Sequence, residues 1–366
     1  MNDKIIKYDL VIDARMLGAS GIGEYIEHTV KGITISSDFK ILLMVFDDYL
    51  NFFGPKHSNL HYIVLKHKVY NPLENLELAL KIPKSIIYWT PHFNTTILPT
   101  RAEKRLTTIH DVFHLANPSY FSFFKYRYLK FLYTMAGFLS EKIITVSKFS
   151  KDEIEVYLGE NVSKKVEIVY NGFKKSSISK YKKETQDAPK ILFVGNLKPH
   201  KNLGVLLDAF EALSLKRKLK LVIIGKITGF INPVSNNIID KIKANKNIEL
   251  TGYVSNEELE SHYQTSSIFV FPSLYEGFGL PILEAYSNNV PTIVSNIPPF
   301  KEVASDASIY FDPSDSGDLV NKIIYLLDSE IESEKLIEKG YKRLDDFSWE
   351  KAVDEHILLI KSMILN

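Results

Sequence analysis

Short apolar runs alternate with amphipathic helical patterns along the second half of the chain. Residues 190–195, 219–225 and 268–271 are apolar runs of strand length, and residues 203–213 repeat apolar positions at helical spacing. Polar or glycine-bearing turns follow these runs, and residues 247–254 place a glycine and an aromatic residue after a fourth strand. Strands that alternate with helices predict an α/β domain built on a parallel sheet, whose ligands bind outside the carboxyl ends of the strands.

The first half of the chain repeats this pattern. Residues 8–13 predict a strand that leads through a loop with several glycines into a helix. We therefore expect two doubly wound domains, residues 1–172 and residues 190–347. Residues 173–189, rich in lysine, serine and other polar residues, predict the linker between the domains, and residues 348–366 continue a final amphipathic helix.

The composition indicates a two-domain globular protein. The 366 residues are 45% hydrophobic and 24% charged, which suits two cores of ordinary size. A net charge of +1 argues against a dedicated nucleic-acid-binding protein, and the lack of cysteine excludes disulfides and thiolate metal sites. Residues 1–7 lack the apolar core of a secretory signal, and no apolar stretch reaches the ~20 residues that span a bilayer. We therefore expect a cytoplasmic protein.

Two glutamates flank a glycine-rich loop within residues 273–284. The loop follows a predicted strand, and Gly277 and Gly279 precede a helical pattern. Backbone N–H groups and the positive end of the helix dipole can hold a diphosphate there, because glycine lets the backbone approach closely. Glu276 precedes the predicted helix and Glu284 lies roughly two turns further on. The two carboxylates can therefore contact different parts of one ligand, one the transferred sugar and the other the ribose. The alternative is that Glu276 caps the helix and Glu284 is a solvated helix residue.

A second polar loop follows the predicted strand at residues 190–195. This loop carries Lys198 and Lys201, and the turn after the next strand carries Gly225. Both turns follow the carboxyl ends of strands, where parallel sheets bind their ligands. A lysine at that place can neutralise a diphosphate leaving group.

These motifs resemble the nucleotide-sugar site of the retaining glycosyltransferases of family 4, also called glycosyl transferases group 1. The resemblance rests on residues 193–202, 251–254 and 276–284, in the order and spacing of the family. Residues 166–172 resemble its interdomain stretch, and residues 107–111 resemble an acceptor-side loop of its first domain. The resemblance implies the GT-B fold, in which two doubly wound Rossmann-like domains face each other across a cleft and the last helix crosses back to the first domain.

The resemblance also implies roles for individual residues. Glu276 would contact the transferred sugar, Glu284 would hold the ribose hydroxyl groups, and Lys201 would hold the phosphates with the loop amides. Many family members place a second basic residue near that lysine. Here Lys198 or His200 can fill this role, or both are solvated loop residues. The expected donor site comprises Gly21, Gly23, Asn196, Lys198, Lys201, Gly225, Tyr253, Val254, Gly277, Phe278, Gly279, Leu280 and Glu284.

The glycines of the first half belong to a loop predicted at residues 14–23, before a helix from about Glu24. Their spacing does not match the dinucleotide-binding fingerprint, so we do not expect a nicotinamide cofactor. In related transferases this loop lies over the donor phosphates or faces the acceptor. Gly21 and Gly23 are our candidates for that contact.

His110 and Asp111 follow a predicted strand at residues 105–109, which places them at its carboxyl end. The histidine can donate a hydrogen bond to the sugar or position the acceptor hydroxyl, and the aspartate can orient the ring or act on the acceptor. With Glu276 they form the expected catalytic group. The remaining histidines of this half lack such support and are interpreted as structural: His28, His92 and His114.

Aromatic residues crowd residues 119–133, between Lys125, Arg127 and Lys130. Such a segment can lie at a lipid interface. It can equally be an aromatic-rich core helix whose basic side chains extend their charged ends to water, and we favour this interpretation.

These observations predict a retaining hexosyltransferase that needs no metal or cofactor, since the chain contains no Asp-x-Asp motif for a cation-bridged diphosphate. GDP-mannose is the first choice of donor and a UDP-hexose the second. The resemblance implies a glycan or undecaprenyl-linked acceptor in surface polysaccharide synthesis, such as O-antigen, lipopolysaccharide or capsule, with peripheral membrane contact as an option. Two alternatives remain, a nucleotide-sugar 2-epimerase of the same fold and a noncatalytic sugar-binding protein.

Overall fold

The computed structural model describes residues 7–50, 52–54, 57–175, 188–226 and 233–365. Residues 1–6 and residues 176–187 lie outside the described ranges. The expectation of no secretory signal rests on the first of these segments, and the second is part of the predicted linker. The chain separates into two compact units. The first combines Met1–Gly172 with Phe347–Asn366, and the second is Phe173–Asp346.

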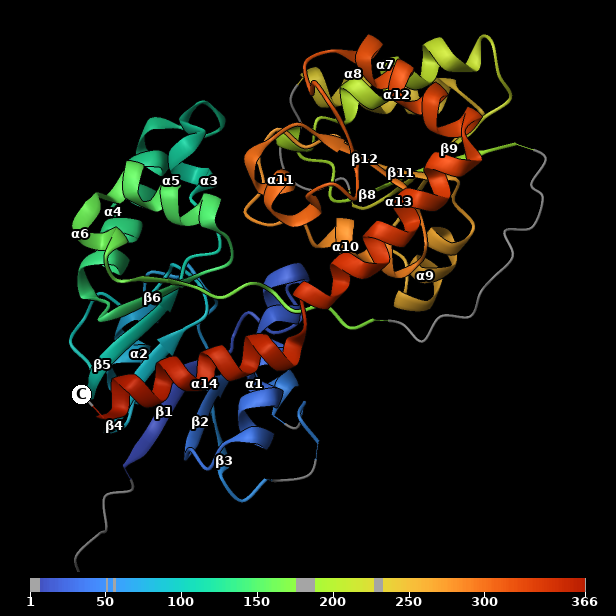
Figure 1. Cartoon of the computed structure of the whole chain (residues 1–366). Helices are drawn as coiled ribbons and strands as arrows, with labels where there is room; N and C mark the ends of the chain where they lie inside the picture. Colours follow the sequence, from blue (N-terminus) through green and yellow to red (C-terminus); the bar gives the residue numbers. More distant parts are fainter. Residues whose placement is uncertain (1–6, 51, 55–56, 176–187, 227–232, 366) are drawn as a thin grey trace, which may run out of the picture. The chain divides into compact units, whose positions relative to one another are not determined.

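The first unit contains a parallel sheet with strand order β3-β2-β1-β4-β5-β6-β7 (Figure 1). Residues Ile12 and Trp89 face each other in the pairing of β1 with β4, and every pairing in the sheet is parallel. The strands are β1 (Tyr8–Asp13), β2 (Ile41–Val45), β3 (Leu60–Val64), β4 (Ser85–Thr90), β5 (Ala102–Thr108), β6 (Lys142–Thr145) and β7 (Val166–Ile168). All five residues of β2 are buried, as expected for a parallel strand that is covered on both faces.

Helices cover both faces of this sheet. Alternate residues of a strand therefore belong to different apolar cores. Leu10 and Ile12 of β1 belong to one apolar core, and Val11 between them belongs to another. The helices of the first unit are α1 (Ser20–Ser36), α2 (Glu74–Lys81), α3 (Phe113–Ala116), α4 (Phe123–Leu139), α5 (Lys148–Leu158), α6 (Glu160–Ser163) and α14 (Trp349–Leu365). This arrangement is the predicted doubly wound domain.

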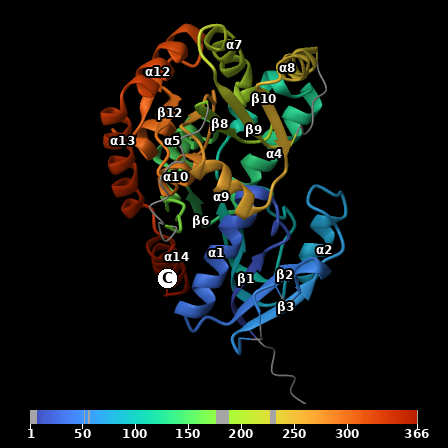
Figure 2. The same ribbon diagram turned by 90° about the vertical axis from the view of Figure 1, so that its right-hand side faces the viewer.

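The last helix, α14, completes the core of the first unit beside α1 (Figures 1 and 2). Val353 and Ile360 are buried in the core that α1 shares. His356 is fully buried, and Tyr25 of α1 donates a hydrogen bond to its Nε2 at 2.7 Å, because Nδ1–H donates to the carbonyl of Ala352. The expectation that the last helix returns to the first domain is therefore confirmed.

The second unit contains a parallel sheet with strand order β10-β9-β8-β11-β12-β13. Its strands are β8 (Lys190–Val194), β9 (Lys220–Ile224), β10 (Ile248–Gly252), β11 (Ile268–Phe271), β12 (Thr292–Ser295) and β13 (Ile309–Phe311). Its helices are α7 (Leu203–Ser214), α8 (Pro233–Ala244), α9 (Asn256–Gln264), α10 (Leu280–Ser287), α11 (Pro298–Ala304), α12 (Ser316–Asp328) and α13 (Glu330–Arg343). Because β8 lies between β9 and β11, the chain changes direction across the sheet there, and such a switch point opens a crevice at the carboxyl ends of β8 and β11.

Candidate active site

The glycine-rich loop joins β11 to α10, as the sequence predicted. Gly279 adopts φ +113°, and a Cβ atom added to it would lie 3.0 Å from the ring of Phe300. A side chain is therefore strained at this position, and the glycine lets the chain turn directly into α10. Leu280 is the first residue of α10. Phe278 is only 4% exposed, so its ring packs in the interior of the second unit.

The loop after β8 meets the loop after β11 at the switch point. The backbone N–H of Leu274 donates to the carbonyl of His200 at 2.8 Å. Lys201 Nζ lies 2.5 Å from Glu276 Oε1 and 5.2 Å from the ring centre of Phe271, and the Lys201 and Glu276 side chains are each 16% exposed. The structure thus brings together the lysine predicted to bind phosphate and the carboxylate predicted to contact the sugar.

Glu284 lies within α10 and receives a hydrogen bond from the Tyr263 hydroxyl at 2.7 Å. Tyr263 belongs to α9 and is fully buried. Burial, followed by the negative charge of Glu284, raises the pKa of Tyr263, so the phenol keeps its proton and remains a donor. The sequence did not reveal this partner, because the two residues are 21 positions apart on different helices.

Further predicted donor residues lie after the neighbouring strands. Asn196 and Lys198 belong to the loop after β8, and Lys198 is exposed. Gly225 follows β9, and Tyr253 and Val254 follow β10. Tyr253 is 75% exposed, and Lys226 Nζ lies 4.7 Å from the centre of its ring. These residues share the carboxyl edge of the sheet with Lys201.

The predicted position of the first helix was wrong. Helix α1 begins at Ser20, so Gly21 and Gly23 lie in its first turn and not in the loop before it. A Cβ atom on Gly23 would lie 2.8 Å from the backbone nitrogen of Gly18, so Gly23 allows α1 to pack against the preceding loop. The sequence favoured a loop because glycine is a poor helix former, but close packing imposes the helix here.

His110 and Asp111 follow β5, as predicted. The carbonyl of Pro91 can only accept a hydrogen bond, so His110 Nε2–H donates to it at 3.1 Å. Burial lowers the pKa of His110, which favours the neutral ring with Nδ1 as its acceptor. Asp111 Oδ1 accepts from the backbone N–H of Phe113 at 2.9 Å and so fixes the start of α3. His110 therefore suits accepting a hydrogen bond from a ligand better than donating one.

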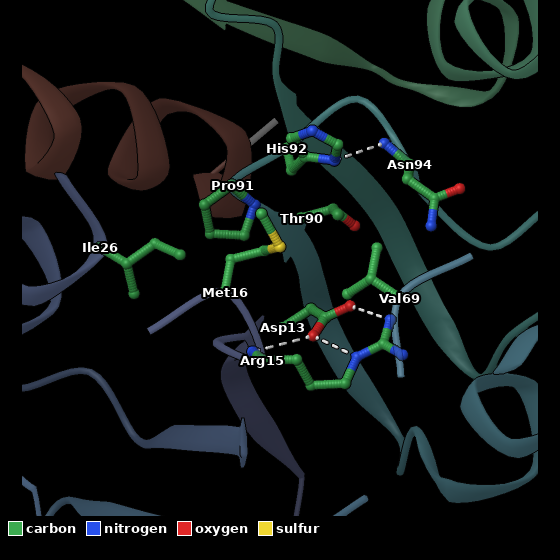
Figure 3. A pocket seen from close by; sticks show the side chains of 9 residues that line it. All are labelled: Asp13, Arg15, Met16, Ile26, Val69, Thr90, Pro91, His92 and Asn94. Atoms are coloured by element: carbon green, nitrogen blue, oxygen red, sulfur yellow. Dashed lines mark hydrogen bonds and ion pairs between the residues drawn. The ribbon is translucent and has the colours of Figure 1, made fainter. Parts of the chain in front are cut away.

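A small pocket lies at the carboxyl ends of β1 and β4, which are neighbours in the first sheet (Figure 3). Its lining includes His92 and an ion pair in which Arg15 Nη2 lies 2.7 Å from Asp13 Oδ2. Arg15 Nη1 also lies 3.0 Å from Glu74 Oε2, and the three charged side chains are almost fully buried. The sequence interpretation treated His92 as a structural residue, although His92 follows β4 in the same way that His110 follows β5.

Comparisons with known proteins agree with this architecture. The Glycosyl transferases group 1 family matches residues 174–343. The chain is 30% identical to O-antigen chain mannosyltransferase B of Escherichia coli over 76% of this chain and 75% of the relative. It is 28% identical to the O-antigen chain mannosyltransferase RfbU of Salmonella typhimurium over 84% of this chain and 87% of the relative.

A solved structure gives the same result for the fold. The structure of Anabaena HepE in complex with UDP and glucose superposes with a TM-score of 0.74 at 14% identity, over 97% of this chain and all of that chain. The protein therefore belongs to the glycosyl transferases group 1 and is a glycosyltransferase with the GT-B fold.

Proposed function

We propose that the protein transfers a hexosyl group from a nucleoside-diphosphate sugar to a glycan or an undecaprenyl-linked glycan, with retention at the anomeric carbon and without a metal ion. Mannose from GDP-mannose is the first choice, and a UDP-hexose is the second. The observation that carries the proposal is the pairing of Lys201 with Glu276 beside the start of α10. The names of the two O-antigen mannosyltransferase relatives support the choice of mannose and of surface polysaccharide synthesis.

The charges at this edge suit departure of a diphosphate. Lys201 and the positive end of α10 offer favourable electrostatics to an anion, which lowers the energy of the transition state. On binding, the diphosphate replaces Glu276 as the partner of Lys201 and leaves the carboxylate to position the sugar. The bond from the anomeric carbon to the diphosphate breaks, a bond to the acceptor oxygen forms on the same face, and the acceptor proton leaves with the diphosphate. In this proposal Lys201 and the positive end of α10, and not a metal ion, stabilise the negative charge of the departing diphosphate.

Glu284 is assigned to the ribose of the donor. A carboxylate can accept hydrogen bonds from two hydroxyl groups. The Tyr263 hydroxyl donates to Glu284 Oε2 at 2.7 Å and so fixes the orientation of this carboxylate. His110 and Asp111 are assigned to the acceptor side. Acceptance through His110 Nδ1 would orient an acceptor hydroxyl without charging the ring.

Thermal stabilisation by nucleotides tests the donor assignment. GDP, UDP and ADP, with EDTA present, are compared on the wild type, Glu284→Ala and the control Glu334→Ala, which removes an exposed carboxylate of α13. A nucleotide at ~100 times its Kd stabilises by about 2.7 kcal/mol. We expect one nucleotide to stabilise the wild type and the control, with the response lost in Glu284→Ala. An unchanged response in Glu284→Ala would remove the ribose assignment.

Incubation with the matching nucleotide sugar separates the alternatives. A transferase releases nucleoside diphosphate faster when an acceptor glycan is added, and its product keeps the anomeric configuration by NMR. A 2-epimerase converts the sugar without an acceptor, and a sugar-binding protein leaves the donor intact.

We also propose that α4 makes peripheral contact with the inner face of the cytoplasmic membrane. Leu129, Leu132 and Tyr133 pack in the core, as the favoured interpretation expected. The other face exposes aromatic rings, including Phe124 at 84% and Phe138 at 74%, among basic side chains, and the helix contains no acidic residue. An aromatic and basic face suits an anionic lipid surface. No helix in the described ranges is long and apolar enough to cross a membrane.

Co-sedimentation with vesicles tests this contact. We expect the protein to sediment with phosphatidylglycerol vesicles but not with phosphatidylcholine vesicles. Phe124→Ser with Phe138→Ser should abolish sedimentation, whereas Tyr325→Ser, which changes an exposed ring of α12, should not. Equal sedimentation of both variants would contradict the assignment.

A further inference from the structure

Tyr70 lies in a backbone conformation that its residue type rarely adopts. Its φ angle is +69°. It is the third residue of a turn that closes when the N–H of Asn71 donates to the carbonyl of Lys68 at 3.0 Å. Glycine or asparagine usually fills a turn position with positive φ, because a Cβ atom is crowded there. A bulky aromatic residue at this position points to a role for the side chain itself.

The buried ion network next to the pocket holds this conformation. The backbone N–H of Tyr70 donates to Glu74 Oε1 at 2.9 Å, and Asn94 Nδ2 donates to the same oxygen at 2.8 Å. The other oxygen, Oε2, pairs with Arg15. One buried carboxylate thus ties the strained turn to the loop after β4 and to the loop after β1.

Tyr70 is 44% exposed, and its ring stands beside His92. The two ring centres are 6.0 Å apart at 79°, and the Tyr70 hydroxyl lies 3.5 Å from His92 Nε2. The backbone N–H of Asn94 donates to His92 Nδ1 at 3.3 Å, which places the ring proton on Nε2. Burial lowers the pKa of His92 to about 3, so the ring stays neutral. Its Nε2–H contacts the Tyr70 hydroxyl at a distance longer than an ordinary hydrogen bond, so this donor is weakly satisfied.

The negative charge of Glu74 also influences a second exposed tyrosine. Tyr128 of α4 is 48% exposed. Burial and then the negative charge of Glu74 raise the pKa of Tyr128, so its hydroxyl keeps its proton. The surroundings of Tyr70 therefore offer apolar ring surface and uncharged hydrogen-bonding groups.

We propose that Tyr70 and His92 form the subsite that binds the terminal sugar ring of the acceptor. The exposed ring of Tyr70 packs against the C–H face of a pyranose, and His92 Nε2–H and the Tyr70 hydroxyl hydrogen-bond its hydroxyl groups. The subsite lies at the switch point between β1 and β4, where ligands of parallel sheets bind. The pocket in Figure 3 is too small for a sugar ring, so the sugar lies at its mouth. The inference rests on the proposed transferase function.

Saturation-transfer NMR with α-mannobiose and methyl α-glucoside tests the subsite without turnover. The variant Tyr70→Asn removes the ring but retains a residue type that tolerates positive φ, so it keeps the turn. Tyr325→Ala removes a tyrosine of similar exposure, 52%, from the second unit. We expect signal transfer to α-mannobiose from the wild type and from Tyr325→Ala, and loss of at least 80% of it in Tyr70→Asn.

Tyr70→Phe separates the two contacts. It keeps the ring and removes the hydroxyl, so we expect a weaker but measurable signal. A full signal in Tyr70→Asn, or no signal from the wild type with either sugar, would overturn the subsite. Nucleotide stabilisation of the same samples reports the donor site independently, so loss of the subsite alone leaves that response intact, whereas failure of the proposed function removes it.

Discussion

The two sheets carry charge differently at their switch points. After β8 and β11, Lys201 and Glu276 form an ion pair whose side chains are each 16% exposed. After β1 and β4, Arg15 is enclosed between Asp13 and Glu74, and each of the three side chains is at most 5% exposed. The second unit therefore has charge that an anion can reach, whereas the first unit uses its charge to hold loops that present neutral groups. This difference suits an anionic donor at one edge and an uncharged sugar at the other.

Removal of Arg15 should have the largest effect on stability. Arg15→Met leaves Asp13 and Glu74 buried without their cation, which costs about 3–5 kcal/mol. Denaturant unfolding followed by tryptophan fluorescence reports the first unit, because both tryptophans of the chain, Trp89 and Trp349, belong to it. The control Lys164→Ala breaks an ion pair whose side chains are 67% and 71% exposed and should change stability by about 0–1 kcal/mol.

Equal stability of Arg15→Met and Lys164→Ala would show that the buried network is not what holds the loops of the first unit.

Removal of Lys201 should act on catalysis and not on folding. Lys201→Met removes the cation that pairs with Glu276, and loss of one such preorganised charge lowers kcat by about 10²–10³-fold. Initial rates with saturating nucleotide sugar measure this effect. The control Lys216→Met changes an exposed lysine after α7 and should keep the wild-type rate. A rate for Lys201→Met within tenfold of the wild type would argue that the diphosphate leaves elsewhere.

Two glycines in the first turn of α1, Gly21 and Gly23, test the corrected start of this helix. Gly23→Ala places a Cβ atom 2.8 Å from Gly18 N, so we expect a loss of about 1–3 kcal/mol from overpacking. Gly21→Ala lies on an exposed position in the same turn and should stabilise by up to about 1 kcal/mol. Thermal unfolding of the pair measures both effects. Equal changes would contradict the packing role of Gly23.

Acid should weaken the first unit through its buried histidines. Burial lowers the pKa of His92 to about 3 and that of His356 to about 4, below the unfolded value of about 6.5. As pH falls from 6.5 to 4, the unfolded chain takes up protons that the folded chain excludes. The free energy of unfolding therefore falls by about 1.4 kcal/mol per pH unit for each histidine.

Unfolding at pH 7, 6 and 5 measures this slope. His356→Gln should make the slope shallower whatever its effect on stability at pH 7. An identical slope in wild type and variant would mean that His356 is not neutral in the folded state.

Much of the second unit could be predicted because its site residues lie in loops that directly follow strands. Strand β11 has the predicted bounds, and the loop with Glu276 leads directly from it into α10. A parallel sheet collects such loops at one edge, so strand positions alone bring Lys201 near Glu276. Tyr263 was missed because it reaches Glu284 from the preceding helix, which only tertiary packing shows.

The site in the first unit was harder to predict for a physical reason. Its groups are held by one buried carboxylate, Glu74, which contacts Arg15, Tyr70 and Asn94 from three different loops. No local pattern encodes these contacts, and the positive φ of Tyr70 contradicts the usual preference of its residue type. A signal was present in His92, which lies two residues after β4, at the carboxyl end of a strand.

Hydrogen-exchange mass spectrometry with each ligand separately tests most directly whether the donor binds at the edge of the second sheet and the acceptor sugar at the edge of the first. The account predicts that the stabilising nucleotide slows exchange in residues 196–202 and 273–284, and that α-mannobiose slows exchange in residues 67–74 and 90–96. Protection of residues 67–74 by the nucleotide, with no change in residues 273–284, would contradict it.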